Sequence, residues 1–232
     1  MGFFDFLKSS KSEPRHSEAL PDGGPTNEDL KQDVIDLIRQ EVLFGFADEA
    51  EILEAMWDLE TDYGETLNEE WLKHRIAEYY TAYREEGRRW EQTTDYDRLA
   101  SAFDELNREK IIALHKAGYT KQDGYSDVGE VMEHLHPDVK PIGFCFYHTQ
   151  DLERAIDPGI RNLFLAFDDI GQDDEKAVLV GKKIVTKLNE HGLKTEWNGT
   201  VDQRIEIKDI RWQKAPDGQD WGLERAIRLL NH

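Results

Sequence analysis

His148 and Asp151 are the residues whose types and spacing best fit a chemical role. His148 follows an apolar segment that predicts a strand buried on both faces, made of Ile142, Phe144, Cys145, Phe146 and Tyr147. Thr149 is then expected to cap a short helix over residues 150–156. Open α/β sheets usually bind ligands where a strand ends and a helix begins, so the pair would face a crevice. A histidine oriented by a carboxylate is the arrangement of a general base.

The same residues also have a purely structural interpretation. Thr149 and Asp151 are residue types that cap helices, and acidic side chains in a first turn interact favourably with the helix dipole. His148 would then only bond a nearby carbonyl. Because capping explains these residue types, we assign no catalytic residues. The predicted binding residues are His148, Gln150, Asp151, Glu153 and Trp197.

Motifs for metals and cofactors do not assemble in this sequence. It contains no phosphate-binding loop, no Gly-x-Ser-x-Gly and no His-Glu-x-x-His. Cys145 and His148 form a Cys-x-x-His, but residues three apart on a strand point to opposite faces and would not converge on a metal. The acidic run from Asp168 to Asp174 has hard-cation chemistry, yet acids there also start a helix. We therefore predict no metal and no cofactor.

A strong excess of acidic residues limits the kinds of partner. The 232-residue chain has a formal net charge of −20, which argues against nucleic acid and against an anionic membrane surface. A protein partner remains, and a basic one would be complementary. No segment has the length of a membrane-spanning helix. With the single cysteine Cys145 and no recognisable signal peptide, we expect a cytoplasmic protein.

Four segments follow one another along the chain. Residues 1–25 form a tail with one short apolar turn and a breaker-rich linker, either a docking peptide or a frayed terminus. Residues 26–92 form an acidic helical domain, residues 93–214 an α/β domain, and residues 215–232 a polar turn and a short helix. Between Val42 and Leu72 there are ten acids and no Lys or Arg, either a docking face or an ordinary solvated helix exterior.

Periodicity and turn residues predict an α+β fold. About three helices come first, near residues 28–44, 48–62 and 68–91. In the second part, Asp95 is expected to cap a helix, residues 117–124 to form a loop, and Ser126 to cap the next helix. Strands are predicted at 110–115, 142–147, 163–167, 193–197 and 204–207, and a long helix at 173–191. The last two strands would form a hairpin at Asn198-Gly199, which gives a mixed sheet of about five strands.

Several segments carry a resemblance to a known family. They are Leu37–Gly45, Trp90 with Asp95–Leu106, Phe146–Ala155, Leu163–Phe167, Val180–Gly181 and Gly192–Gly199. In these the chain, from about residue 30 to 213, resembles a bacterial family known only as a domain of unknown function. The resemblance implies that the helical and α/β parts belong together, and it offers no activity. Many relatives look to have a cysteine-rich segment where residues 118–127 here have none, so a metal or redox role there does not transfer.

Three functional hypotheses remain. The leading one is a non-enzymatic, cytoplasmic protein-binding or regulatory module, with a groove near His148, Gln150, Asp151 and Trp197 as its contact surface. The alternative is a small hydrolase-like enzyme in which Asp151 orients His148 as general base in an open pocket. The third is a structural role through helical oligomerisation of residues 26–92.

Overall fold

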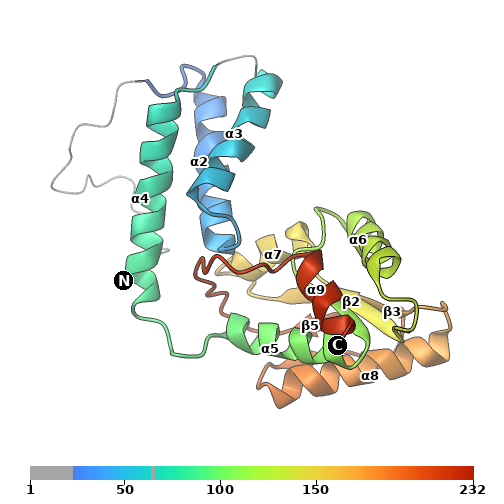
Figure 1. Ribbon diagram of the computed structural model, residues 1–232. Coiled ribbons are helices and arrows are strands. Elements are labelled where there is room, and N and C mark those ends of the chain that lie inside the picture. Colours follow the sequence, from blue (N-terminus) through green and yellow to red (C-terminus); the bar gives the residue numbers. More distant parts are fainter. Residues whose placement is uncertain (1–22, 64–65) are drawn as a thin grey trace. The chain divides into compact units, whose positions relative to one another are not determined.

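The computed structural model describes residues 23–63 and 66–232, which form eight helices and one mixed five-stranded sheet (Figure 1). The predicted α+β class is confirmed. The chain divides into two compact units, one with the residues up to Gln92 and Gln213–Gly218, the other with Thr93–Trp212 and Gln219–His232. Of the predicted tail, residues 1–22 lie outside the described residues.

The helical unit contains α2 (Glu28–Phe44), α3 (Glu49–Tyr63) and α4 (Glu69–Gly87). The predicted three-helix bundle is therefore confirmed. The side chain of Asn27 accepts hydrogen bonds from the first turn of α2, and Asn68 does the same for α4. Gly45 ends α2 in the left-handed conformation, with a φ of 73°. The buried face follows the helical period and includes Leu30, Val34, Ile38, Val42, Ile52, Met56, Trp71, Leu72, Ile76 and Tyr80.

Residues 213–218 belong to the helical unit, whereas residues 219–232 belong to the α/β unit. The Tyr83 hydroxyl donates a hydrogen bond to the Lys214 carbonyl at 2.9 Å. The Lys214 side chain is buried, with its ammonium 3.5 Å from the Asp217 carboxylate and 4.8 Å from the centre of the Phe46 ring. A buried ammonium needs such partners because it loses its hydration.

The sheet of the α/β unit has the strand order β1-β2-β3-β5-β4. Its strands are β1 (Ile111–Leu114), β2 (Gly143–Phe146), β3 (Leu163–Asp169), β4 (Thr195–Glu196) and β5 (Ile205–Ile207). β1 and β2 are parallel, and the other neighbours are antiparallel. All four residues of β2 are buried, as its apolar run predicts.

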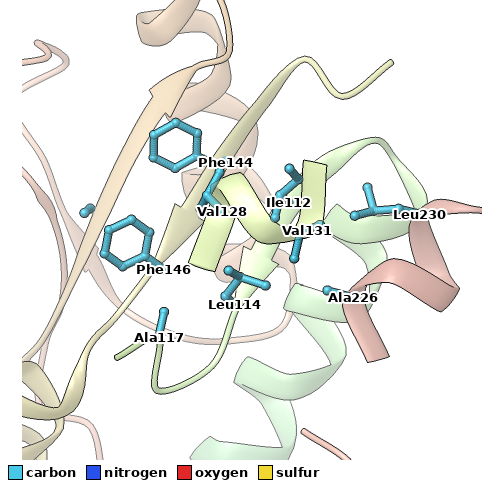
Figure 2. Close-up of a cluster of buried hydrophobic side chains, with 10 residues drawn as sticks. Ile112, Leu114, Ala117, Val128, Val131, Phe144, Phe146, Ala226 and Leu230 are labelled. Atoms are coloured by element: carbon cyan, nitrogen blue, oxygen red, sulfur yellow. The ribbon is translucent and has the colours of Figure 1, made fainter. Parts of the chain in front are cut away.

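Helices cover both faces of this sheet (Figure 1). They are α5 (Asp95–Arg108), α6 (Lys121–His134), α7 (Thr149–Ile156), α8 (Asp174–Glu190) and α9 (Leu223–Leu230). α6 and α9 pack on the face to which Phe144 and Phe146 point, and the cluster between them is drawn in Figure 2. α8 packs on the other face, where Gly181 lies against Phe167. Successive side chains of β3 point to opposite faces of the sheet, so the face of Phe167 determines the face of each remaining residue in this strand.

Two predicted helix starts in this unit are wrong. α5 is capped by Thr94 rather than Asp95, and α6 begins at Lys121, inside the predicted loop, with Thr120 rather than Ser126 as its cap. In both helices a threonine accepts a bond from a backbone N–H three residues on, where an aspartate bonds back to the threonine N–H. This reciprocal capping box satisfies two backbone donors at once and is stronger than a single cap.

The C-terminal hairpin also differs from its prediction. β4 and β5 are antiparallel, but they are shorter than the predicted strands and are joined by residues 197–204 instead of a two-residue turn. Asn198 bonds the backbone N–H and hydroxyl of Thr200, and Gly199 has a φ of 83°. The Asn-Gly pair therefore forms a local turn at the start of a longer loop.

Candidate functional site

The candidate site lies where β2 passes into α7. His148, with extended backbone angles, is the N-cap residue of α7, and Thr149 is its first helical residue. The sequence analysis predicted Thr149 as the N-cap, which is one residue too late. The Thr149 hydroxyl instead donates a hydrogen bond to the Gly118 carbonyl at 2.9 Å, because the loop before α6 lies against the start of α7.

The same loop occupies the N-terminus of α7. The backbone N–H of Thr149 donates to the Gly118 carbonyl at 3.1 Å, and that of Gln150 to the Tyr119 carbonyl at 3.4 Å. These are the groups that would bind an anionic ligand at a free helix end. Since protein carbonyls already accept their hydrogens, the start of α7 is not the open crevice that the strand-to-helix pattern predicts.

Asp151 is the centre of a buried ionic cluster. Its carboxylate is fully buried and lies 3.0 Å from Nε2 of His148, itself only 5% exposed. Nη1 of Arg204 is 2.9 and 3.1 Å from the two carboxylate oxygens. Nη1 of Arg154, one helical turn on, is 3.3 Å away. The cluster thus joins α7 to the loop 197–204, and its carboxylate is balanced by two guanidinium groups.

The environment of His148 favours its neutral form. Burial lowers the pKa of its imidazole, the nearby Arg204 and Arg154 lower it further, and Asp151 opposes them. Because the carboxylate can only accept, Nε2 carries the hydrogen of the neutral ring. Nδ1 is buried and has no hydrogen-bond partner among the described residues. The pair therefore has the orientation of a general base, but its free nitrogen does not face solvent.

The lowered pKa of His148 predicts a pH dependence of stability. The unfolded chain binds a proton at this histidine near its ordinary pKa, 6.5, while the folded protein does so only at lower pH. Its contribution to stability is thus complete above pH 6.5 and is lost as the pH falls from there through the folded pKa. Urea denaturation at several pH values should show that acid lowers the free energy of unfolding less in His148→Gln than in the wild type. Equal losses would contradict the assignment.

Trp197 lies on the other face of the sheet from the His148–Asp151 cluster. Its ring packs edge-on against Phe167, with centroids 5.4 Å apart, on the face covered by α8. Arg204 lies over Phe164, the position of opposite orientation in β3, with its guanidinium carbon 4.9 Å from the ring centre. The structure therefore brings His148 and Asp151 together but does not place Trp197 beside them.

Gln150 and Glu153 lie at the partly exposed rim of α7. Beside Gln150 is Tyr119, the most exposed aromatic residue of the described chain at 55%. Sequence reasoning missed both Tyr119 and Arg204. The (i, i+3) spacing of Arg154 to Asp151 was a readable signal, whereas no local pattern relates Arg204 to a residue 53 positions earlier.

A family model described as "Domain of unknown function (DUF6891)" matches residues 27–216. The chain belongs to this family. The match confirms the resemblance to a family of unknown function, and it includes sequence from both units of this DUF6891 protein. No curated protein and no solved structure matches the chain. Among the described helices, none combines the length and apolar character that crossing a membrane requires.

The acidic run and the cysteine of this DUF6891 protein have structural roles. Asp169 accepts a hydrogen bond from the backbone N–H of Asp173, and Asp173 caps α8 by accepting one from Lys176. Cys145 is completely buried, and burial raises the pKa of its thiol far above the usual range, which removes the reactive thiolate. Within residues 23–63 and 66–232, no three His, Cys, Asp or Glu side chains are grouped to hold a metal ion.

Proposed function

We propose that this protein is a non-enzymatic, cytoplasmic binding or regulatory module that recognises a protein partner through the exposed side of α7. The observation that carries the proposal is an exposed tyrosine and two arginines around a buried carboxylate. Tyr119, Gln150, Arg154 and Arg204 form this area, called the α7 surface below. Tyrosine and arginine are the residue types enriched where protein interfaces are strongest.

The α7 surface is held in one arrangement by buried contacts. The buried carboxylate of Asp151 orients Arg154 and Arg204. Hydrogen bonds from the start of α7 to the carbonyls of Gly118 and Tyr119 fix the loop that carries Tyr119. A buried ion pair stabilises a fold weakly, because removing two charges from water costs most of their attraction. Its benefit here is a defined geometry, which reduces the ordering cost of binding.

The strong acidity favours a partner with a basic surface. A net charge of −20 attracts cationic proteins over a distance of about one Debye length, roughly 8 Å at physiological ionic strength, and repels nucleic acid. Such attraction mainly raises the association rate, while the contacts at the α7 surface would determine the dissociation rate.

The alternative function is a small hydrolase-like enzyme that uses His148 and Asp151. The 3.0 Å contact between them favours it, because it fixes the imidazole as a general base requires. The burial of both side chains disfavours it, since Nδ1 of His148 does not face solvent. A hydrolytic activity that disappears in folded His148→Gln would support the enzyme instead.

Tyr119→Ser is expected to weaken partner binding about thirtyfold or more, the loss typical of an interface hot spot. The measurement is native mass spectrometry of the tagged full-length protein isolated gently from its own host. The wild type should carry a protein at fixed stoichiometry, and Tyr119→Ser should lose it. Because Tyr119 is largely exposed, the substitution leaves the core intact.

Leu179→Ser is the matched control. Leu179 is exposed to the same extent as Tyr119, 58% against 55%, but belongs to α8 on the opposite face of the sheet. Its substitution should leave the complex unchanged. A wild-type protein that carries no partner, or a partner that Tyr119→Ser retains, would contradict the proposal.

A further inference from the structure

The ionic cluster around Asp151 brings three basic groups to one carboxylate. The imidazole of His148 lies 3.0 Å from it, and the guanidinium groups of Arg204 and Arg154 lie 2.9 and 3.3 Å away. With a neutral imidazole, the cluster already holds two positive charges against one negative charge. A proton on His148 would add a third positive charge at a residue that is only 5% exposed, where water screens charges poorly.

The charged groups that act on this imidazole come from three elements. Asp151 and Arg154 belong to α7, Arg204 to the loop 197–204, and Asp123 to α6. Asp123 attracts a proton to His148, but its carboxylate already accepts two backbone N–H groups just before α6. The pKa of His148 is lowered because burial and the two guanidinium groups outweigh the two carboxylates, and Arg204 opposes the protonated form more than Arg154 does.

A proton would enter at the buried nitrogen Nδ1 of His148. In the neutral ring Nε2 carries the hydrogen that points to Asp151, so Nδ1 is the basic nitrogen. Among residues 23–63 and 66–232, Nδ1 has no hydrogen-bond partner. An imidazolium in this arrangement would have a buried N–H without an acceptor as well as two guanidinium neighbours. The closed cluster and a protonated His148 therefore disfavour each other.

Arg204 can leave the cluster because its guanidinium reaches solvent. Its side chain is 33% exposed, and residues 200–202 of its loop are exposed. Its departure would remove the two hydrogen bonds that join the loop 197–204 to α7. Arg154 is more exposed, but it lies in the same helix as Asp151, so its departure would separate no two elements.

We propose that protonation of His148 releases Arg204 from Asp151, so that the loop 197–204 loses its contact with α7 in mild acid. The imidazolium then replaces the guanidinium as the partner of the buried carboxylate, and water admitted by the open loop accepts the hydrogen on Nδ1. Because Arg204 is part of the α7 surface, partner binding would weaken in acid. That consequence rests on the function proposed above, whereas the release of Arg204 does not.

The release is expected below pH 6.5. In the open form His148 takes up its proton near its ordinary pKa, 6.5, whereas in the closed cluster burial lowers its pKa. The closed form therefore has its full advantage above pH 6.5 and loses it as the pH falls from there through the lowered pKa.

Trp197 provides a signal for the loop. Its indole N–H donates to the carbonyls of Thr200 and Gln203, at 2.9 and 3.1 Å, and Gln203 is the neighbour of Arg204. The ring itself packs against Phe167 on the other face of the sheet, so it does not contact the imidazole. A change in the indole signal would therefore report a change of the loop.

NMR of the full-length protein, labelled with ¹⁵N in histidine and tryptophan, tests the proposal between about pH 7.5 and about pH 5. We expect the Trp197 indole signal and the His148 imidazole signals to change together, with one midpoint below pH 6.5. Hydrogen exchange of the β2 amides should stay slow over the same range, because the change is local and the sheet does not unfold.

His148→Gln should keep the Trp197 signal at its neutral-pH position throughout, because the amide can donate to Asp151 without titrating. His134→Gln is the matched control: His134 is an exposed histidine of α6, and its loss should leave the Trp197 titration unchanged. A Trp197 signal that stays constant down to about pH 5, or that changes in His148→Gln as in the wild type, would overturn the proposal.

The wild type alone decides the question if His148→Gln does not fold. Separate midpoints for the His148 imidazole and the Trp197 indole would then contradict the release of Arg204, and a shared midpoint would support it. A wild-type protein that carries no partner contradicts the function proposed for the α7 surface but leaves the expected Trp197 titration unchanged.

Discussion

Arg204→Met is expected to lower the free energy of unfolding of the α/β unit by roughly 2–4 kcal/mol. Arg204 contacts both oxygens of the fully buried Asp151 carboxylate, and methionine keeps the apolar stem while it removes the guanidinium. The carboxylate would then have only neutral His148 and the single contact from Arg154. Hydrogen exchange of the β2 amides reports this loss for the α/β unit alone.

Arg154→Met is the control for this result. Arg154 also contacts Asp151, but its side chain is 47% exposed, so its ion pair should contribute at most about 1 kcal/mol. Asp151→Asn provides a second check, because it removes the charge that Arg204 balances. In the Arg204→Met background this change should cost less than in the wild type. Equal effects of the two arginine substitutions would show that Asp151 does not depend on Arg204.

Local signals predicted the parts of the fold that depend on one segment alone. β2 was predictable because a strand between two helical layers must be apolar at consecutive positions, as Phe144, Cys145 and Phe146 are. α2 was predictable because its buried residues repeat with the helical period between Asn27 and Gly45. In each case the burial and the turn residues point to the same structure.

α6 shows how a local signal can be outweighed. The loop predicted at residues 117–124 contains Gly118 and Gly124, and glycine is a poor helix former. The Thr120-x-x-Asp123 capping box is a stronger marker, because it satisfies backbone donors that would otherwise remain unpaired. Gly124 is needed because the Phe146 ring packs against it, a contact that cannot be read from the sequence.

The candidate site was predictable only where its partners are close in sequence. His148 and Asp151 occupy the N-cap and third positions of one helix, a spacing that brings their side chains together. Arg204 joins them through the pairing of β5 with β3, which no local pattern determines. Trp197 packs against Phe167 from the loop after β4, on the face covered by α8, and this tertiary contact also lies outside any local pattern.

Gly124→Ala is expected to destabilise the α/β unit by about 1–3 kcal/mol, although alanine is the better helix former. An added Cβ would lie 2.7 Å from Cζ of the Phe146 ring and closer still to other ring atoms. The Phe146 ring is fully buried among its neighbours, with Phe144 beside it (Figure 2). The Tyr125 ring packs edge-on against it, so it cannot shift easily. Hydrogen exchange of β1 and β2 amides measures the change.

Gly129→Ala, in the same helix, should have the opposite effect. An added Cβ at Gly129 meets nothing within 4 Å, so the substitution should stabilise the unit by about 0.5–1 kcal/mol through helix propensity alone. Changes of opposite sign in the free energy of unfolding at these two glycines of α6 would distinguish the effect of packing from that of helix propensity. Phe146→Leu should cost less in the Gly124→Ala background than in the wild type, because the smaller side chain relieves the overlap. A stabilising Gly124→Ala would mean that α6 does not approach β2 as closely as the structure has it.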